Sequence, residues 1–107
     1  MKVVQRGIMN ILPGKMAEAM ELLEKHMAIM SRLAEIPREK FPMRTYRPYL
    51  GGGDSLHTVI FEVEWDSLAA MDAFFNKAMA DPEMQALMPK WEAVEESHRV
   101  EVLMLIP

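Results

Sequence analysis

Segments with two different hydrophobic periods alternate along this chain, and their order restricts the folds that it can adopt. Residues 2–11 are rich in β-branched side chains and end at the sequence LPGK, which indicates a strand followed by a turn. From Met16 onward, apolar residues recur at spacings of four and three, a pattern typical of one face of a helix. We expect this helix to end near Ile36, because Pro37 disfavours helical geometry in the residue before it.

The middle of the chain predicts a β-hairpin. Residues 43–50 and 56–65 are rich in strand-forming side chains, and they flank the sequence GGGDS at 51–55. A phosphate-binding glycine loop would lead into a helix and carry a lysine, whereas this loop leads into a strand and carries none. We therefore interpret it as a turn whose glycines supply positive φ values. Pro48 cannot donate to a sheet ladder, so the first strand is expected at an edge.

Two helical pieces follow the hairpin. Asp66 or Ser67 is expected to cap a helix over residues 68–80. Asp81 is followed directly by a proline, the typical start of a second helix with its cap and first helical residue. Pro89 should kink or break that second piece, because proline removes one helical hydrogen bond.

The last segment, residues 98–106, has apolar residues at every even position and predicts a strand. The complete order is β-α-β-β-α-β, with the second helix in two pieces. This order predicts an α+β, ferredoxin-like fold with a four-stranded antiparallel sheet. A length of 107 residues suits one domain, so we expect residues 1–107 to form a single domain.

Composition removes several classes of function. The net charge is −4 and no basic cluster is present, which argues against nucleic-acid binding. The absence of cysteine excludes disulfides, thiolate zinc sites and iron–sulfur clusters. The three histidines have no metal-binding spacing, so no metal is predicted. Gln5, Arg6 and Asn10 interrupt the apolar run near the start, so we expect no signal peptide or membrane span and a cytoplasmic protein.

The two faces of the predicted sheet differ in character. In a ferredoxin-like sheet the first strand lies between the third and the fourth, so side chains on each face must agree across three strands. One choice of register makes one face almost wholly apolar and places it under the helices. That face comprises Val3, Gln5, Gly7, Met9, Ile11, His57, Val59, Phe61, Val63, Trp65, Val100, Val102, Met104 and Ile106.

The opposite face mixes aliphatic residues with charges that compensate each other. Arg6 on the central strand is expected between Glu62 and Glu101. This face is too apolar to be left to water, because exposed apolar patches of several hundred Å² usually mark an interface. We therefore predict a homodimer that packs through this face of the sheet.

Four stretches of the chain carry a resemblance to a known superfamily: ILPGKMAEAMELL, FEVEWDSLAAMDAFF, DPEMQAL and the terminal VEVLMLIP. With them the chain resembles the dimeric α/β-barrel superfamily, and within it the NIPSNAP-like proteins and the antibiotic-biosynthesis-type monooxygenases. The resemblance implies a dimeric α/β barrel. It also implies a choice of activities, since the superfamily contains cofactor-free monooxygenases of aromatic polyketides, haem-degrading oxygenases, lactone isomerases and proteins of unknown role.

The resemblance argues against haem. The haem-degrading branch uses an asparagine on the first strand, with a tryptophan and a histidine on the second helix. These positions align here with Gly7, with Phe74 or Phe75, and with Leu87, and none matches. No cofactor is therefore predicted.

His57 is the candidate catalytic residue. We expect it on the helix-covered face beside an apolar row, where an imidazole could serve as acid or base. The alternative is a histidine that makes a structural hydrogen bond at the hairpin. On the same face Gly7 is expected to leave a void under the helices, with Gln5 at its rim and Trp65 farther along, as in a largely apolar ligand pocket. The alternative for Gly7 is a packed bulge.

The hairpin register decides which other side chains reach this pocket. If Leu50 pairs with Leu56, Tyr49 lies opposite His57 and Arg47 opposite Val59, a pair suited to an anionic or phenolic ligand. The alternative role of both is solvation or support of the dimer. A slip by one residue would bring in Arg44, Tyr46 and Pro48 instead.

The remaining two histidines lie on other elements. His26 stands beside the Met-rich stripe of the first helix and either faces the pocket or lies at the helix flank. His98 begins the last strand and is expected near the surface. The twelve methionines recur at helical spacing and are expected in the core.

Two functions are compatible with these residues and with the resemblance. The first is a small-molecule enzyme of oxygenase or isomerase type, acting on a hydrophobic or aromatic substrate without a bound cofactor. The second is a non-catalytic dimeric module that binds a ligand or a partner.

Overall fold

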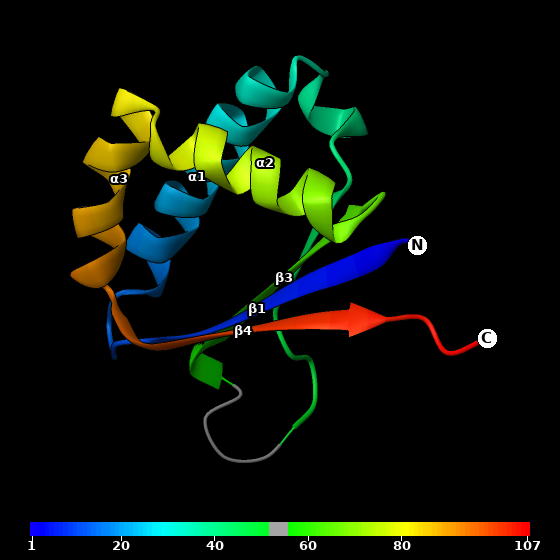
Figure 1. Ribbon diagram of the computed structural model, residues 1–107. Coiled ribbons are helices and arrows are strands. Elements are labelled where there is room, and N and C mark those ends of the chain that lie inside the picture. The colour runs from blue at the N-terminus through cyan, green and yellow to red at the C-terminus, as the bar shows by residue number, and fades with distance from the viewer. Residues whose placement is uncertain (52–55) are drawn as a thin grey trace.

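The computed structural model describes residues 1–51 and 56–107, and Figure 1 shows its helices gathered on one face of a sheet. It confirms the α+β, ferredoxin-like fold. The turn predicted at 51–55 lies, apart from its first residue, outside the described residues. The elements in chain order are β1 (Val3–Ile11), α1 (Met16–Ala34), a 3-10 turn (Arg38–Lys40), β2 (Met43–Tyr46), β3 (Thr58–Trp65), α2 (Leu68–Met79), α3 (Pro82–Glu92) and β4 (Glu95–Met104). Within the described ranges, no helix is long and apolar enough to cross a membrane.

The helix ends follow local chemistry. Ser67 caps α2, since its side chain accepts a hydrogen bond from the Ala70 backbone N–H at 3.0 Å. Asp81 caps α3 in the same way by accepting from the Met84 N–H at 3.0 Å. Helix α1 ends two residues before the predicted position, because Glu35 adopts a left-handed conformation with φ of 58°.

Pro89 does not end α3. The helix continues through it to Glu92. A proline in the last turn removes only the hydrogen bond that its own N–H would have donated, and Ala93 still donates to the Pro89 carbonyl at 3.2 Å. The predicted break is therefore wrong, and the kink that was its alternative stays a prediction.

The sheet order is β2-β3-β1-β4, with β1 in the centre and all three pairings antiparallel. The register confirms the two predicted faces. Arg6 lies opposite Glu62 on one side and Glu101 on the other, and its Nε donates to Glu62 Oε2 at 2.7 Å. Several strand ends differ from prediction. Strand β2 stops at Tyr46, β3 starts only at Thr58, and β4 runs from Glu95 to Met104 where 98–106 was expected.

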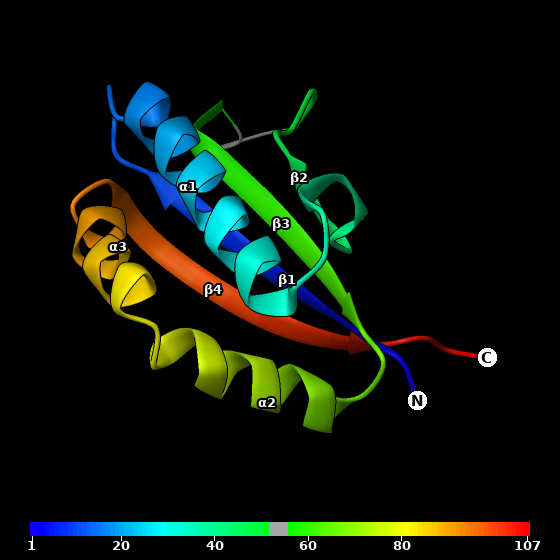
Figure 2. The same cartoon turned by 90° about the horizontal axis from the view of Figure 1, so that it is seen from above.

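The three helices cover the apolar face unevenly. Helix α1 lies over β1 and β3, whereas α2 runs beside β4 at the edge of the sheet (Figure 2). Seven residues of α1 are buried, but only Ala78 of α2 is. The helix-facing side chains of β4, among them Val100 and Val102, consequently stay 49% and 43% exposed. All four methionines of α1 pack in or against the core as predicted, whereas Met1, Met79 and Met104 are exposed, contrary to the prediction.

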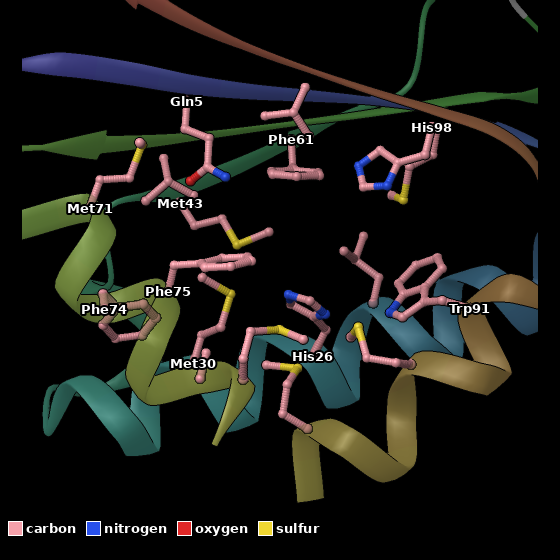
Figure 3. A pocket seen from close by; sticks show the side chains of 18 of the residues that line it. Gln5, His26, Met30, Met43, Phe61, Met71, Phe74, Phe75, Trp91 and His98 are labelled. Atoms are coloured by element: carbon pink, nitrogen blue, oxygen red, sulfur yellow. The ribbon is translucent and has the colours of Figure 1, made fainter. Parts of the chain in front are cut away.

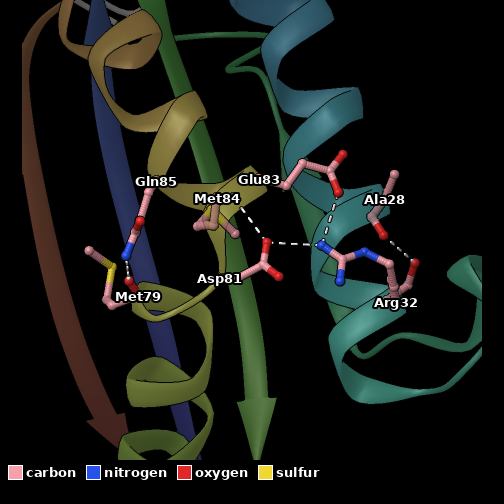
Figure 4. Close-up of polar contacts among 8 residues, drawn as sticks. Ala28, Arg32, Met79, Asp81, Glu83, Met84 and Gln85 are labelled. Carbon is pink, nitrogen blue, oxygen red and sulfur yellow. Dashed lines mark hydrogen bonds and ion pairs between the residues drawn. The ribbon is translucent and has the colours of Figure 1, made fainter.

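Polar contacts fasten the junction of α2 and α3 to α1. Arg32, in the last turn of α1, donates to Asp81 Oδ2 and to Glu83 Oε1, both at 2.9 Å (Figure 4). The hydrogen bond from Arg32, together with the one from the Met84 N–H, lowers the pKa of Asp81 below its usual value. Lys77 Nζ adds a bond to the Leu33 carbonyl at 2.6 Å, so the C-terminal half of α2 is also tied to α1.

Gly7 is covered by an aromatic ring. It pairs regularly with Phe61 on one side and Val100 on the other, so it is not a bulge. The space that a Cβ would need at Gly7 is occupied by the ring of Phe61. The predicted void at Gly7 is therefore wrong, because the neighbouring side chain fills it.

A methyl group at Gly7 should destabilise the protein through this ring. We expect Gly7→Ala to lower the free energy of unfolding by about 1–3 kcal/mol in urea titrations, since the ring must leave a packed position. Combining it with Phe61→Ala should remove most of that penalty. Equal penalties with and without the Phe61 ring would contradict the explanation.

Candidate functional site

A cavity of about 360 Å³ lies between the sheet and the helices, and Figure 3 shows the side chains that surround it. Its volume falls within the range of small-molecule sites. All of α1, α2, α3 and the four strands contribute to its wall, which is mostly apolar and aromatic. The lining residues are Gln5, Met9, Leu23, His26, Met30, Met43, Phe61, Val63, Trp65, Met71, Phe74, Phe75, Ala78, Met79, Met84, Met88, Trp91, Glu92, Glu95, His98 and Val100.

Three of the predicted ligand-binding residues meet in this cavity: Gln5, His26 and Trp65. Gln5 on β1 and Trp65 on β3 are diagonal neighbours in the sheet. Trp65 Nε1 donates to Gln5 Oε1 at 3.0 Å. The Trp65 ring also packs against Phe74 of α2, with ring centroids 5.1 Å apart. Trp65 thereby fixes both the Gln5 side chain and one wall of the cavity. Gly7 does not line the cavity, because Phe61 covers it.

His57 lies outside the cavity. It belongs to a short turn before β3, which begins only at Thr58, and its side chain is exposed. The predicted position under the helices is therefore wrong, because regular strand geometry does not extend to His57. Its catalytic role stays a prediction.

Arg47 and Tyr49 do not line the cavity either. The hairpin has the register predicted for them, since Tyr46 pairs with Ile60 and Thr45 with Phe61. Strand β2 ends at Tyr46, however, and the chain then leaves the ladder. Arg47 donates to the Leu56 carbonyl at 3.3 Å, and Tyr49 is 96% exposed.

The slipped register is excluded by the same pairing. Arg44 lies opposite Glu62, and Tyr46 Oη donates to Glu62 Oε1 at 3.5 Å. Both side chains therefore lie on the face away from the cavity. Consequently, no arginine or lysine of the described residues lines it.

His98 is a cavity residue that was expected only near the surface. It lies opposite Met9 in the sheet, and its ring centroid is 6.3 Å from that of Phe61. His98 is also exposed, which places it at the mouth. The alternation of β4 contained the signal, since His98 is two positions before Val100 on the helix-covered face.

His26 faces the cavity from α1. Burial, with a smaller contribution from the positive charge of His98, lowers the pKa of His26 to about 4, so the imidazole is neutral at pH 7. Its Nδ1 is buried, and so is Nε1 of Trp91; neither has a hydrogen-bond partner among the described residues. The two rings meet edge to face, with centroids 6.2 Å apart and planes at 75°.

The charged side chains of the lining are the acidic residues Glu92 and Glu95, beside His98 near the start of β4. Partial burial raises the pKa of Glu95 above its usual value. No group of three potential metal ligands occurs in the described part of the chain. The cavity thus combines apolar walls with a few neutral polar groups and an acidic rim.

Comparisons with known proteins identify structural neighbours. No protein-family model matches the chain, and no curated protein is similar to it in sequence. A NIPSNAP family protein from Agrobacterium tumefaciens superposes with a TM-score of 0.82 at 23% identity, over 98% of this chain and 86% of that one. A NIPSNAP domain protein from Burkholderia xenovorans gives 0.79 at 20% identity, over 97% and 94%.

An enzyme is also among the neighbours. SnoaB from Streptomyces nogalater, described as a cofactor-independent oxygenase, superposes with a TM-score of 0.66 at 13% identity, over 99% of this chain and 94% of that one. Similarities at these identities establish a shared fold. These similarities confirm, for the fold, the resemblance that the sequence predicted.

The neutral state of His26 predicts a specific acid sensitivity. The pKa of His26 is about 4 in the folded protein and near 6.5 in the unfolded chain. Above pH 6.5 the residue is neutral in both states, so it causes no loss of stability there. As the pH falls from 6.5 to 4, the unfolded chain binds a proton that the folded one does not. We expect the folded protein to lose at most about 3 kcal/mol through this residue.

Urea titrations of the native protein and His26→Phe at pH 7.5 and 4.5 test this expectation. The native protein should lose more stability than the variant between the two values. Glu92, Glu95 and His98 are present in both proteins, so the comparison isolates the effect of His26. Equal losses would mean that His26 is not held neutral by its surroundings.

Proposed function

We propose that this protein binds a hydrophobic, aromatic small molecule in the cavity between sheet and helices and acts on it as an oxygenase or isomerase without a bound cofactor. The observation that carries the proposal is the cavity itself, about 360 Å³ in volume and lined mainly by aromatic rings and methionines. Methionine side chains adapt to irregular apolar shapes, and aromatic rings stack on flat ligands. The likeness to a cofactor-independent oxygenase supports this class of chemistry.

Proton transfer in such a reaction would be the task of His98. Imidazole is the side chain that enzymes most often use as a general acid or base. His98 reaches both the cavity and the solvent, so it can exchange protons with water between turnovers. His57, in contrast, faces solvent alone, and His26 is kept neutral by burial.

A second candidate function is ligand binding without catalysis. It is favoured by the failure of His57, Arg47 and Tyr49 to assemble in the cavity. The protein would then carry or sense a hydrophobic molecule.

Filling the cavity should abolish binding of an apolar probe. Ala78 is buried in the wall, so Ala78→Phe should weaken binding of the neutral fluorophore N-phenyl-1-naphthylamine by at least about tenfold. Ala73→Phe is the matched control, since Ala73 lies exposed on the same helix. Equal binding by both variants would place the probe outside the cavity.

Oxygen uptake separates the two candidate functions. Bound aromatic hydroquinones should consume dioxygen without added cofactor, and His98→Ala should slow this uptake more than His57→Ala, because His98 lines the cavity and His57 does not. Tight binding with no uptake and no isomerisation would favour the non-catalytic module.

We also propose that two copies of the protein pack through the sheet face opposite the helices. The half-buried aliphatic residues Val4, Ile8, Ile60 and Leu103 lie there around the ion pair of Arg6 and Glu62. Exposed aliphatic patches of this kind usually belong to interfaces. The charges at its centre are already paired within the chain, which lowers the cost of burying them.

A charge at the middle of this face should separate the copies. Ile60→Glu should raise the dissociation constant of the dimer at least roughly 30-fold, because the new carboxylate would be buried opposite Ile8 and Tyr46, with no cation directly across either neighbouring strand. Light scattering over a concentration series measures the change. Ile36→Glu, on a surface outside the sheet, is the matched control and should leave the mass unchanged. A concentration-independent monomeric mass for the native protein would remove the dimer.

A further inference from the structure

The amide of Gln5 presents a hydrogen-bond donor to the cavity. A glutamine side chain has one acceptor oxygen and two N–H donors on its nitrogen. Trp65 Nε1 can only donate, so its 3.0 Å bond fixes the oxygen of Gln5 toward Trp65 and leaves Nε2 on the other side. Figure 3 shows this nitrogen turned toward the space between Phe61 and the helices. No hydrogen bond joins it to another residue of the described ranges.

The imidazole of His26 presents a second donor from the opposite wall. Only one of its nitrogens carries a proton in the neutral ring. Its Nδ1 is buried without a hydrogen-bond partner among the described residues, and the Trp91 ring packs edge to face against the imidazole. A proton on Nδ1 would therefore be a buried donor without an acceptor, so the proton belongs on Nε2. In Figure 3 one ring nitrogen of His26 points into the cavity and the other toward Trp91.

Charge also selects among ligands. A carboxylate or phosphate in an apolar cavity needs a cation or several donors to offset its lost hydration. Of the described residues, no lysine or arginine lines the cavity, whereas Glu92 and Glu95 add negative charge near His98. Anions are therefore repelled at the rim and unpaired inside.

We propose that Gln5 Nε2 and His26 Nε2 form a donor site that recognises an uncharged ligand through a carbonyl oxygen, as in a cyclic ketone or lactone. The inference rests on the proposed function, because it assigns the polar contacts of the ligand in the same cavity. Ligands of the same shape without an acceptor oxygen leave both donors unpaired, which is the source of discrimination. Trp65 and Trp91 are positioning residues, since each orients one of the two donors.

Three probes of similar shape test the site by calorimetry: 1-tetralone, tetralin and tetralin-1-carboxylate. We expect the native protein to bind tetralone roughly three- to tenfold more tightly than tetralin, and the carboxylate more weakly than either. His26→Phe and Gln5→Met should each reduce the preference for tetralone while the affinity for tetralin changes less than about twofold. Gln85→Met is the matched control, because Gln85 is exposed on α3 and donates to the Met79 carbonyl.

The outcomes separate this site from the cavity itself. Equal affinities of the native protein for tetralone and tetralin would overturn the donor site and leave apolar binding intact. No binding of tetralin would overturn the cavity as a ligand site. Tightest binding of the carboxylate would overturn the selection against anions.

A spectroscopic measurement on the unmodified protein tests the donor independently of any variant's folding. Two-bond ¹H–¹⁵N correlation spectra distinguish the tautomers of a neutral histidine. At pH 7 we expect His26 to carry its proton on Nε2 in the ligand-free protein. A proton on Nδ1 would make Nε2 an acceptor and would overturn the assignment.

Discussion

The contact between Phe61 and Gly7 is the constraint on which the site depends. A glycine in the central strand allows the aromatic ring of the neighbouring strand to lie flat over the backbone, where any other residue would push it toward the helices. The ring therefore serves as the floor of the cavity. Its other face remains available to a ligand, and its edge approaches His98 at the mouth. The glycine acts on the site through this ring and does not touch the cavity itself.

The polar groups of the site are arranged around that floor with little charge. Gln5 is held by Trp65, and His26 is kept neutral by burial, so both offer directed hydrogen bonds without a charge that would need hydration. A cavity of this kind gains affinity from apolar contact and selectivity from a few oriented donors. Glu92, Glu95 and His98 are concentrated at one end, where water can solvate them.

The fold was predictable from sequence because hydrophobic period and turn chemistry agree with it along most of the chain. The alternation of apolar residues in Val3–Ile11 and Thr58–Trp65 predicted the register of the central strands. Ser67 and Asp81 predicted where α2 and α3 begin, because both are typical N-cap residues. Gln5, His26 and Trp65 were found because they occupy regular positions on such elements. His57, Arg47 and Tyr49 were misplaced because regular strand geometry was extended past its ends. Where a strand stops is decided by long-range packing, which sequence periodicity does not report.

The contacts of Arg32 and Lys77 determine how α2 is held over the cavity. They hold the C-terminal end of α2 and its corner with α3 against α1. The N-terminal end of α2 has its Ser67 cap, and Leu68 is half exposed. Only Ala78 of α2 is buried, so these polar contacts and the ring contact between Trp65 and Phe74 hold the helix in place more than a packed apolar core does. The residues that hold α2 over the cavity, Arg32 and Lys77, are thus different from the residues that line it.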